Sequence, residues 1–195
     1  ETDVLIVSAG ATANATNITS FTADSSTSNS GTANLTTKVG GGTIDIGNST
    51  TGAYSLTGLS GNDTLKGNGN ADIINGGGGD DNIDGRGGND EINGGAGDDI
   101  ITVSSAGQGD GDTIDGGSGT DTLSLSSGSH AFATDAKLQN INSITLASTS
   151  TVIDLTGQTE SLTITGGAQA DTITAGSGDD IINGAGGADI IKGAG

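Results

Sequence analysis

Ten aspartates recur at one place in a nine-residue phrase, and they are the main candidates for chemistry in this chain. The clearest copy, residues 94–102, reads GGAGDDIIT and has the form G-G-x-G-x-D-x-U-x, where U is a large aliphatic residue. The copies begin at Gly58, Gly67, Gly76, Gly85, Gly94, Gly107, Gly116, Gly166, Ala175 and Gly184. Their sixth residues are Asp63, Asp72, Asp81, Asp90, Asp99, Asp112, Asp121, Asp171, Asp180 and Asp189. This regularity predicts a repeated cation site.

The residue types in the phrase indicate which cation would bind. Calcium takes about six to eight hard oxygen ligands from carboxylates and carbonyls. Glycine permits the positive φ angles that turn backbone carbonyls inward. One turn with one aspartate supplies too few oxygens, so we expect two stacked turns to share each ion. The phrase resembles a known calcium-binding nonapeptide repeat, and Ca²⁺ is therefore the expected cofactor.

The elements that position these turns follow from the rest of the phrase. Its eighth residue is Leu or Ile in every copy, and the x-U-x triplet is too short for a helix. It suits a short strand with U pointing inward and its neighbours outward. The chain has 38 Gly, no Pro, Cys, Met or Trp, and three aromatic residues, which excludes a conventional core. An elongated, all-β solenoid fits this composition better.

Residues 58–124 and 166–195 resemble the RTX (repeats-in-toxin) family of secreted bacterial proteins. The resemblance implies a parallel β-roll with two nonapeptides per coil, in which ions lie between turns two repeats apart. It implies about six ions, shared by Asp63/Asp81, Asp72/Asp90, Asp81/Asp99, Asp90/Asp112, Asp99/Asp121 and Asp171/Asp189. Asp180 would need a partner beyond Gly195. Four extra residues between Thr102 and Gly107 break the phase, which weakens the case for Asp90/Asp112 and Asp99/Asp121.

The repeats divide the chain into four expected parts. These are a Thr- and Ser-rich β segment at 1–57, a first RTX calcium-binding β-roll at 58–124, a calcium-free β-solenoid interlude at 125–165, and a second RTX block at 166–195. The first segment either coils beneath the first block or forms a separate sandwich. The chain does not start with Met and stops inside a repeat, so we expect a segment of a longer or processed protein.

Altered repeats continue outside the two blocks. Three residues stand where the second block has aspartate: Ile144, Ile153 and Leu162. Tyr54 does the same before the first block. We interpret these stretches as coils in which apolar packing replaces calcium turns. Residues 133–138 are a candidate loop or short helix, and we interpret His130 as a loop histidine.

Charge excludes some partners and classes of function. The formal net charge is −19, from 24 acidic and five basic residues, which argues against nucleic acid as a partner. No hydrophobic stretch approaches membrane-spanning length. Neighbouring carboxylates such as Asp80 and Asp81 recur periodically, as active sites do not, so we expect no enzyme activity. We expect the repeats to be disordered without calcium and folded with it, since metal binding and folding are coupled in such sites.

Three classes of function remain. The first is a structural surface protein, an S-layer, filament or adhesin that self-assembles on binding calcium. The second is a calcium-folding carrier module of a type I-secreted toxin or exoenzyme, and the third is a module that accompanies a polysaccharide-modifying enzyme. The order of calcium block, DTLSL, Ser/Ala stretch, LxNINSITL and second block resembles RTX-type bacterial S-layer proteins. That resemblance favours the first class, and implies an extracellular location, type I export and a possible cell-surface polysaccharide partner.

Overall fold

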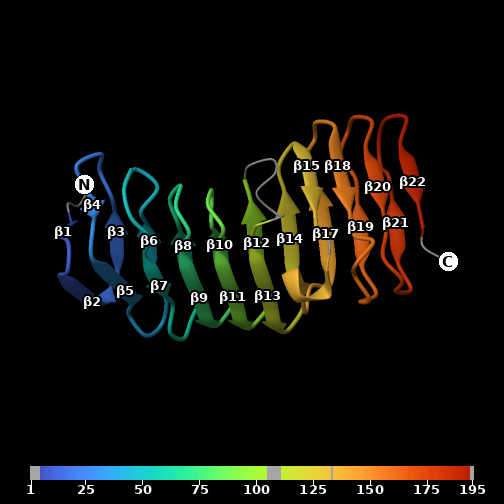
Figure 1. Cartoon of the computed structure of the whole chain (residues 1–195). Coiled ribbons are helices and arrows are strands. Elements are labelled where there is room, and N and C mark those ends of the chain that lie inside the picture. Colours follow the sequence, from blue (N-terminus) through green and yellow to red (C-terminus); the bar gives the residue numbers. More distant parts are fainter. Residues whose placement is uncertain (1–4, 105–110, 133, 194–195) are drawn as a thin grey trace.

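The protein is a single continuous stack of parallel β-coils with almost no helix (Figure 1). The computed structural model describes residues 5–104, 111–132 and 134–193. The predicted all-β, parallel β-solenoid is confirmed. Among the described residues, no helix is long and apolar enough to cross a membrane.

One nine-stranded sheet, which we call the common sheet, runs through the whole stack. Its strands are β3 (Ser20–Thr22), β6 (Thr43–Asp45), β8 (Thr64–Lys66), β10 (Asn82–Asp84), β12 (Ile100–Val103), β14 (Thr122–Leu125), β17 (Ser143–Leu146), β19 (Thr163–Thr165) and β21 (Ile181–Asn183). Each strand sends at least one apolar side chain inward. Strand pairing aligns these residues as a single ladder of Phe21, Ile44, Leu65, Ile83, Ile101, Leu123, Ile144, Ile164 and Ile182.

Two further sheets lie opposite the common sheet, one in the N-terminal coils and one in the C-terminal coils. The N-terminal sheet contains β2 (Thr12–Ile18), β5 (Thr32–Thr37), β7 (Ser55–Thr57), β9 (Ile73–Gly78), β11 (Glu91–Ala96), β13 (Thr113–Ser118) and β16 (Leu138–Gln139). The C-terminal sheet contains β15 (Gly128–Ala131), β18 (Thr151–Asp154), β20 (Thr172–Thr174) and β22 (Ile190–Lys192). In Figure 1 they follow the lower and upper sides of the stack. The remaining elements are the pair β1 (Ile6–Val7) and β4 (Ser28–Asn29), and a 3₁₀ turn, η1 (Asp135–Lys137).

The core is the continuous interior between these sheets. Leu65, Ile83 and Ile101 are fully buried, as are most other members of the common-sheet ladder. Burying one such side chain contributes about 1.5–3 kcal/mol. A coil buries only a few of them, so the stack depends on contacts between successive coils, as in other solenoids.

Residues 5–57 coil beneath the first block and do not form a separate sandwich. Strand β6 pairs with β8, and β7 pairs with β9, so both sheets continue into the first block. Tyr54 takes the place of aspartate as predicted, because its N–H donates to Asp72 Oδ1 (2.8 Å).

The expected phase of the interlude is wrong for two of three residues. Ile144 pairs with Ile164, and Ile153 with Ile173, so both belong to the inward ladders and not to the aspartate position. The coils here are longer than two nonapeptides: 20 residues separate Thr151 from Asp171. Asn142 and Thr151 take the aspartate position, whereas Leu162 does so as predicted.

Of two smaller expectations about the interlude, one is wrong and one is confirmed. His130 is not a loop histidine, because it lies in β15, buried and paired in register with Ile153. Its Nε2 hydrogen bonds with the Ser126 carbonyl oxygen (3.0 Å). The short helix is present as η1. Gly107 and Asp110, which belong to the sixth copy, lie outside the described residues.

Candidate calcium sites

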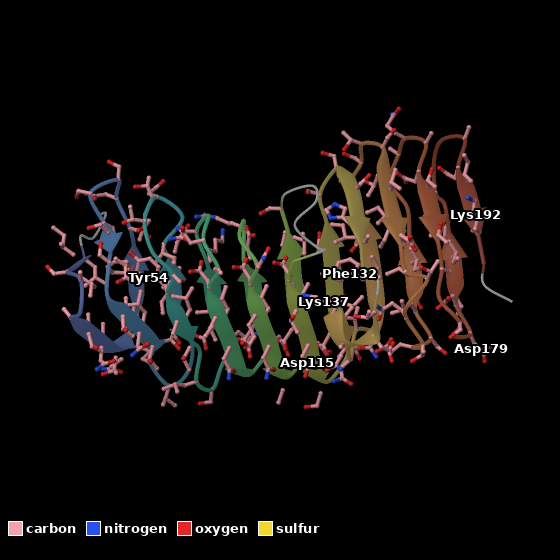
Figure 2. All side chains as sticks on the ribbon, in the orientation of Figure 1. Tyr54, Asp115, Phe132, Lys137, Asp179 and Lys192 are labelled. Carbon is pink, nitrogen blue, oxygen red and sulfur yellow. The ribbon has the colours of Figure 1, made fainter. Side chains whose placement is uncertain are left out.

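The ten aspartates fall into two groups, which we call columns, according to the sheet whose strand follows each of them. The common column contains those directly before common-sheet strands: Asp63, Asp81, Asp99, Asp121 and Asp180. The outer column contains those directly before N-terminal or C-terminal sheet strands: Asp72, Asp90, Asp112, Asp171 and Asp189. Eight of the ten are buried, with 0–3% of their surface exposed, and only Asp180 and Asp189 in the last coils are partly exposed. Figure 2 shows the side chains along the stack, from Tyr54 in the N-terminal coils to Asp179 near the C-terminal end.

Each column is built by a hydrogen bond between coils. The backbone N–H of one aspartate donates to the Oδ1 of the aspartate one coil later, which joins Asp63 to Asp81 at 2.7 Å and Asp72 to Asp90 at 2.8 Å. The same bond joins Asp81 to Asp99 (2.8 Å), Asp90 to Asp112 (2.9 Å), Asp99 to Asp121 (2.9 Å) and Asp171 to Asp189 (3.0 Å). The structure therefore brings together all six pairs that the resemblance implied. The extra residues after Thr102 lengthen one coil to 22 residues without separating the pairs.

The second carboxylate oxygen has a different environment. The Oδ2 atoms of Asp81, Asp99 and Asp121 are buried and have no hydrogen-bond partner. A buried acceptor that lacks a partner costs about 1–3 kcal/mol, and more when it is charged. These oxygens thus need a ligand that the side chains and backbone do not supply.

The glycine that opens each turn leaves space beside that oxygen. A methyl group on Gly94 would collide with Asp99 Oδ2, in its own turn, and with the carbonyl oxygen of Gly116 in the next coil. Gly76 stands in the same relation to Asp81 Oδ2 and the Gly94 carbonyl. Carboxylate and carbonyl oxygens from two coils therefore converge on one place. This is the hard-oxygen ligand set that calcium prefers.

Burial and mutual repulsion make the calcium-free columns electrostatically unfavourable. Burial, as the main cause, raises the pKa of Asp72, Asp81 and Asp112 to about 6. It raises the pKa of Asp90 to about 7, and the neighbouring carboxylates of Asp112 and Asp72 add to the rise. The pKa values of Asp99 and Asp121 are raised for the same first reason, burial.

No basic side chain of the described residues forms an ion pair with either column. The ion pairs found there are those of Arg86 with Asp45 (3.0 Å) and with Asp84 (4.0 Å), and neither aspartate belongs to a column. Nor do three acidic, His or Cys side chains gather at any point of the described chain. Two aspartates and several backbone carbonyls would hold each ion, and the donor set fits calcium on that basis.

Sequence reasoning missed one polar member of the common column. Asn142 accepts the Asp121 N–H at its Oδ1 (2.7 Å), as the aspartates do for their neighbours. Its signal was hidden because it lies outside the nonapeptide phase. The LxNINSITL stretch offered only its polarity next to an aliphatic strand as a clue.

A family model for the RTX calcium-binding nonapeptide repeat matches in four copies, at residues 50–83, 76–105, 106–129 and 163–191. Together the copies cover more than half of the chain. The chain belongs to this RTX family. Its nonapeptide repeats bind Ca²⁺, and proteins that carry them are typically secreted. No curated protein and no solved structure matches the chain.

Proposed function

We propose that this protein is a calcium-dependent extracellular structural protein of the cell surface, an S-layer, filament or adhesin whose coils fold and assemble on binding Ca²⁺. One observation carries the proposal: two columns of buried carboxylates stand between coils, and within the described part of the chain no Lys or Arg forms an ion pair with them, Lys137 acting on Asp112 only at longer range. The ten column aspartates would hold the ions in shared pairs. Binding energy of the metal would then be folding energy.

Charge supports this dependence. Six shared ions would add twelve positive charges and take the formal charge from −19 to about −7. Without them, buried carboxylates repel each other along both columns, and high net charge destabilises compact states. Calcium is scarce in the cytosol and abundant outside, so such a chain would stay unfolded inside the cell and fold after export, by a type I system in the RTX manner.

Surface features support an assembling role over a catalytic one. Isoleucines at the seventh repeat position point outward as the sequence predicted, and Ile73, Ile100 and Ile181 are 53%, 47% and 68% exposed. Such spots let the sheets of neighbouring molecules pack. The acidic residues recur in successive coils. Such a periodic arrangement suits a row of equivalent binding sites better than a single reaction centre. We therefore propose no enzyme activity.

Light scattering and electron microscopy with and without calcium test the proposal. The wild type should form large assemblies in millimolar Ca²⁺ and none in chelator. The double variant Asp81→Ala/Asp99→Ala removes shared ligands and should fail to assemble. The control Asp80→Asn/Asp98→Asn removes the same charge from exposed neighbours of those ligands, keeps the Oδ1 acceptors for the N–H groups of Asp98 and Thr120, and should assemble as the wild type does.

A wild type that folds with calcium but stays monomeric at high concentration would contradict the structural role. It would favour the second candidate, a calcium-folding carrier module of a type I-secreted toxin or exoenzyme. The observation in favour of that candidate is the same set of buried aspartates, which calcium alone would neutralise.

A further inference from the structure

Three unpartnered carboxylate oxygens follow one another along the common column, and each marks a junction between two coils. Asp81 Oδ2 faces the carbonyl of Gly94, and Asp99 Oδ2 faces the carbonyl of Gly116. These two junctions join aspartate to aspartate, as the repeat requires. The third oxygen, Asp121 Oδ2, belongs to a junction that the nonapeptide pattern does not contain.

That third junction lies between the turn that ends at Asp121 and residues 140–142 of the interlude. A methyl group on Gly116 would collide with the Asn140 carbonyl oxygen and would lie 2.7 Å from Asp121 Oδ2. The same two kinds of oxygen therefore converge here as at the two junctions before it. Asp121 is fully buried, so its Oδ2 has no access to bulk water.

The interlude reaches this geometry with a shorter turn. Strand pairing places Gln139 beside Asp115, and thus Asn140 beside Gly116. Only Ile141 separates Asn140 from Asn142, whereas four residues separate Gly116 from Asp121. Asn140 has a left-handed φ of 53°, which asparagine tolerates better than most residues. This conformation aims its carbonyl at the place where a repeat glycine would aim its own.

We propose that the junction of Asp121 with Asn140 and Asn142 binds one further calcium ion. Asp121 Oδ2 supplies the charge, the Asn140 carbonyl and Asn142 Oδ1 supply neutral oxygens, and water completes the shell. An amide oxygen has two lone pairs, so Asn142 accepts the Asp121 N–H and still faces the ion. The site rests on the calcium binding proposed above, but Asn140 and Asn142 lie outside every matched repeat. With one carboxylate where the repeat sites have two, it fills last.

Native mass spectrometry of the full chain across a calcium titration tests this site by counting bound ions. Asn142→Ala removes the side-chain oxygen and should hold one ion fewer than the wild type. Asn142→Asp restores a second carboxylate and should keep the wild-type number, with the last ion binding at roughly tenfold lower calcium, because ligand charge tunes affinity. Circular dichroism in saturating calcium should be the same for all variants.

Asn93→Ala is the matched control, since it removes the same type of side chain from an exposed position of β11, away from the proposed site. It should bind the wild-type number of ions. Equal ion counts for the wild type and Asn142→Ala would overturn the proposal. If Asn142→Ala does not fold, the Asn142→Asp variant decides: an unchanged concentration for the last ion is then the contrary result. A wild type that binds no calcium at all would instead defeat the proposed function.

Discussion

The first calcium block and the interlude use one backbone design with different side chains at its junctions. In the block, Asp99 Oδ1 accepts the Asp81 N–H at 2.8 Å. At the start of the interlude, Asn142 Oδ1 accepts the Asp121 N–H at 2.7 Å. An amide thus satisfies the backbone of the previous coil as well as a carboxylate does.

The two regions differ in the second atom of that side chain. Aspartate adds a charged Oδ2, which is buried without a partner at Asp81 and Asp99, whereas asparagine adds a neutral amide nitrogen. A second neutral contact joins coils in the interlude, where Gln158 Nε2 donates to the carbonyls of Phe132 (2.9 Å) and Thr134 (3.0 Å). The comparison teaches that holding two coils together and holding an ion are separate tasks. Only the second requires the charge.

Removal of calcium should have the largest effect and should separate the two regions. In chelator, circular dichroism should show loss of β structure, because the buried carboxylates lose the cations that neutralise them. During a calcium titration followed by hydrogen exchange, amides of β8 to β13 should lose protection at higher calcium than amides of β17 to β19. Mg²⁺ should not restore the fold, since it demands small octahedral sites. A β spectrum unchanged by chelator would contradict the whole comparison.

Asparagine substitution in the block should make it resemble the interlude. In Asp81→Asn/Asp99→Asn, each side chain keeps its Oδ1 acceptor and loses the buried unpaired charge. Without calcium, the variant should be more stable than the wild type by about 1–3 kcal/mol per site, the usual cost of an unsatisfied buried group. With calcium, the wild type should be more stable than the variant, because the variant has lost charged ligands that two coils share.

Thermal unfolding measures the stability of the variant relative to the wild type, once with calcium and once without it. Asp80→Asn/Asp98→Asn is the charge-matched control. A variant less stable than the wild type under both conditions would show that the second oxygen serves the protein fold itself.

Acid should stabilise the calcium-free block. The folded pKa values of Asp72 and Asp90, about 6 and about 7, exceed their ordinary value of 3.8. The folded state therefore binds more protons than the unfolded chain, and its stability rises as the pH falls from about 7 toward 4. Calcium affinity should fall over the same range, since protons compete for the carboxylates.

Unfolding of chelated protein at pH 7 and pH 5 measures this smaller effect. We expect a compact, β-rich chain at pH 5 and a more unfolded one at pH 7. A chelated chain that is more unfolded at pH 5 would mean that other groups dominate its titration.

Much of the first block could be predicted because its chemistry is local. Asp81 and Ile83 sit at fixed places in one nonapeptide, so the turn and the inward side chain follow from nine residues. The exposed Ile73 and Ile100 follow from strand alternation. The interlude resisted prediction because its coils vary in length, so a period of nine placed Ile144 at the wrong position.

By itself the sequence determined the turns, the inward aliphatic residues and the calcium chemistry, because each depends on residues within one repeat. Tertiary structure alone decided which turns face each other. The stack keeps its aliphatic ladder in register, since a slip by one residue would expose every inward side chain. Asp99 and Asp121 therefore stay paired although 22 residues of sequence separate them. The same register brings Asn140 and Asn142 onto Asp121, a meeting that no local pattern encodes.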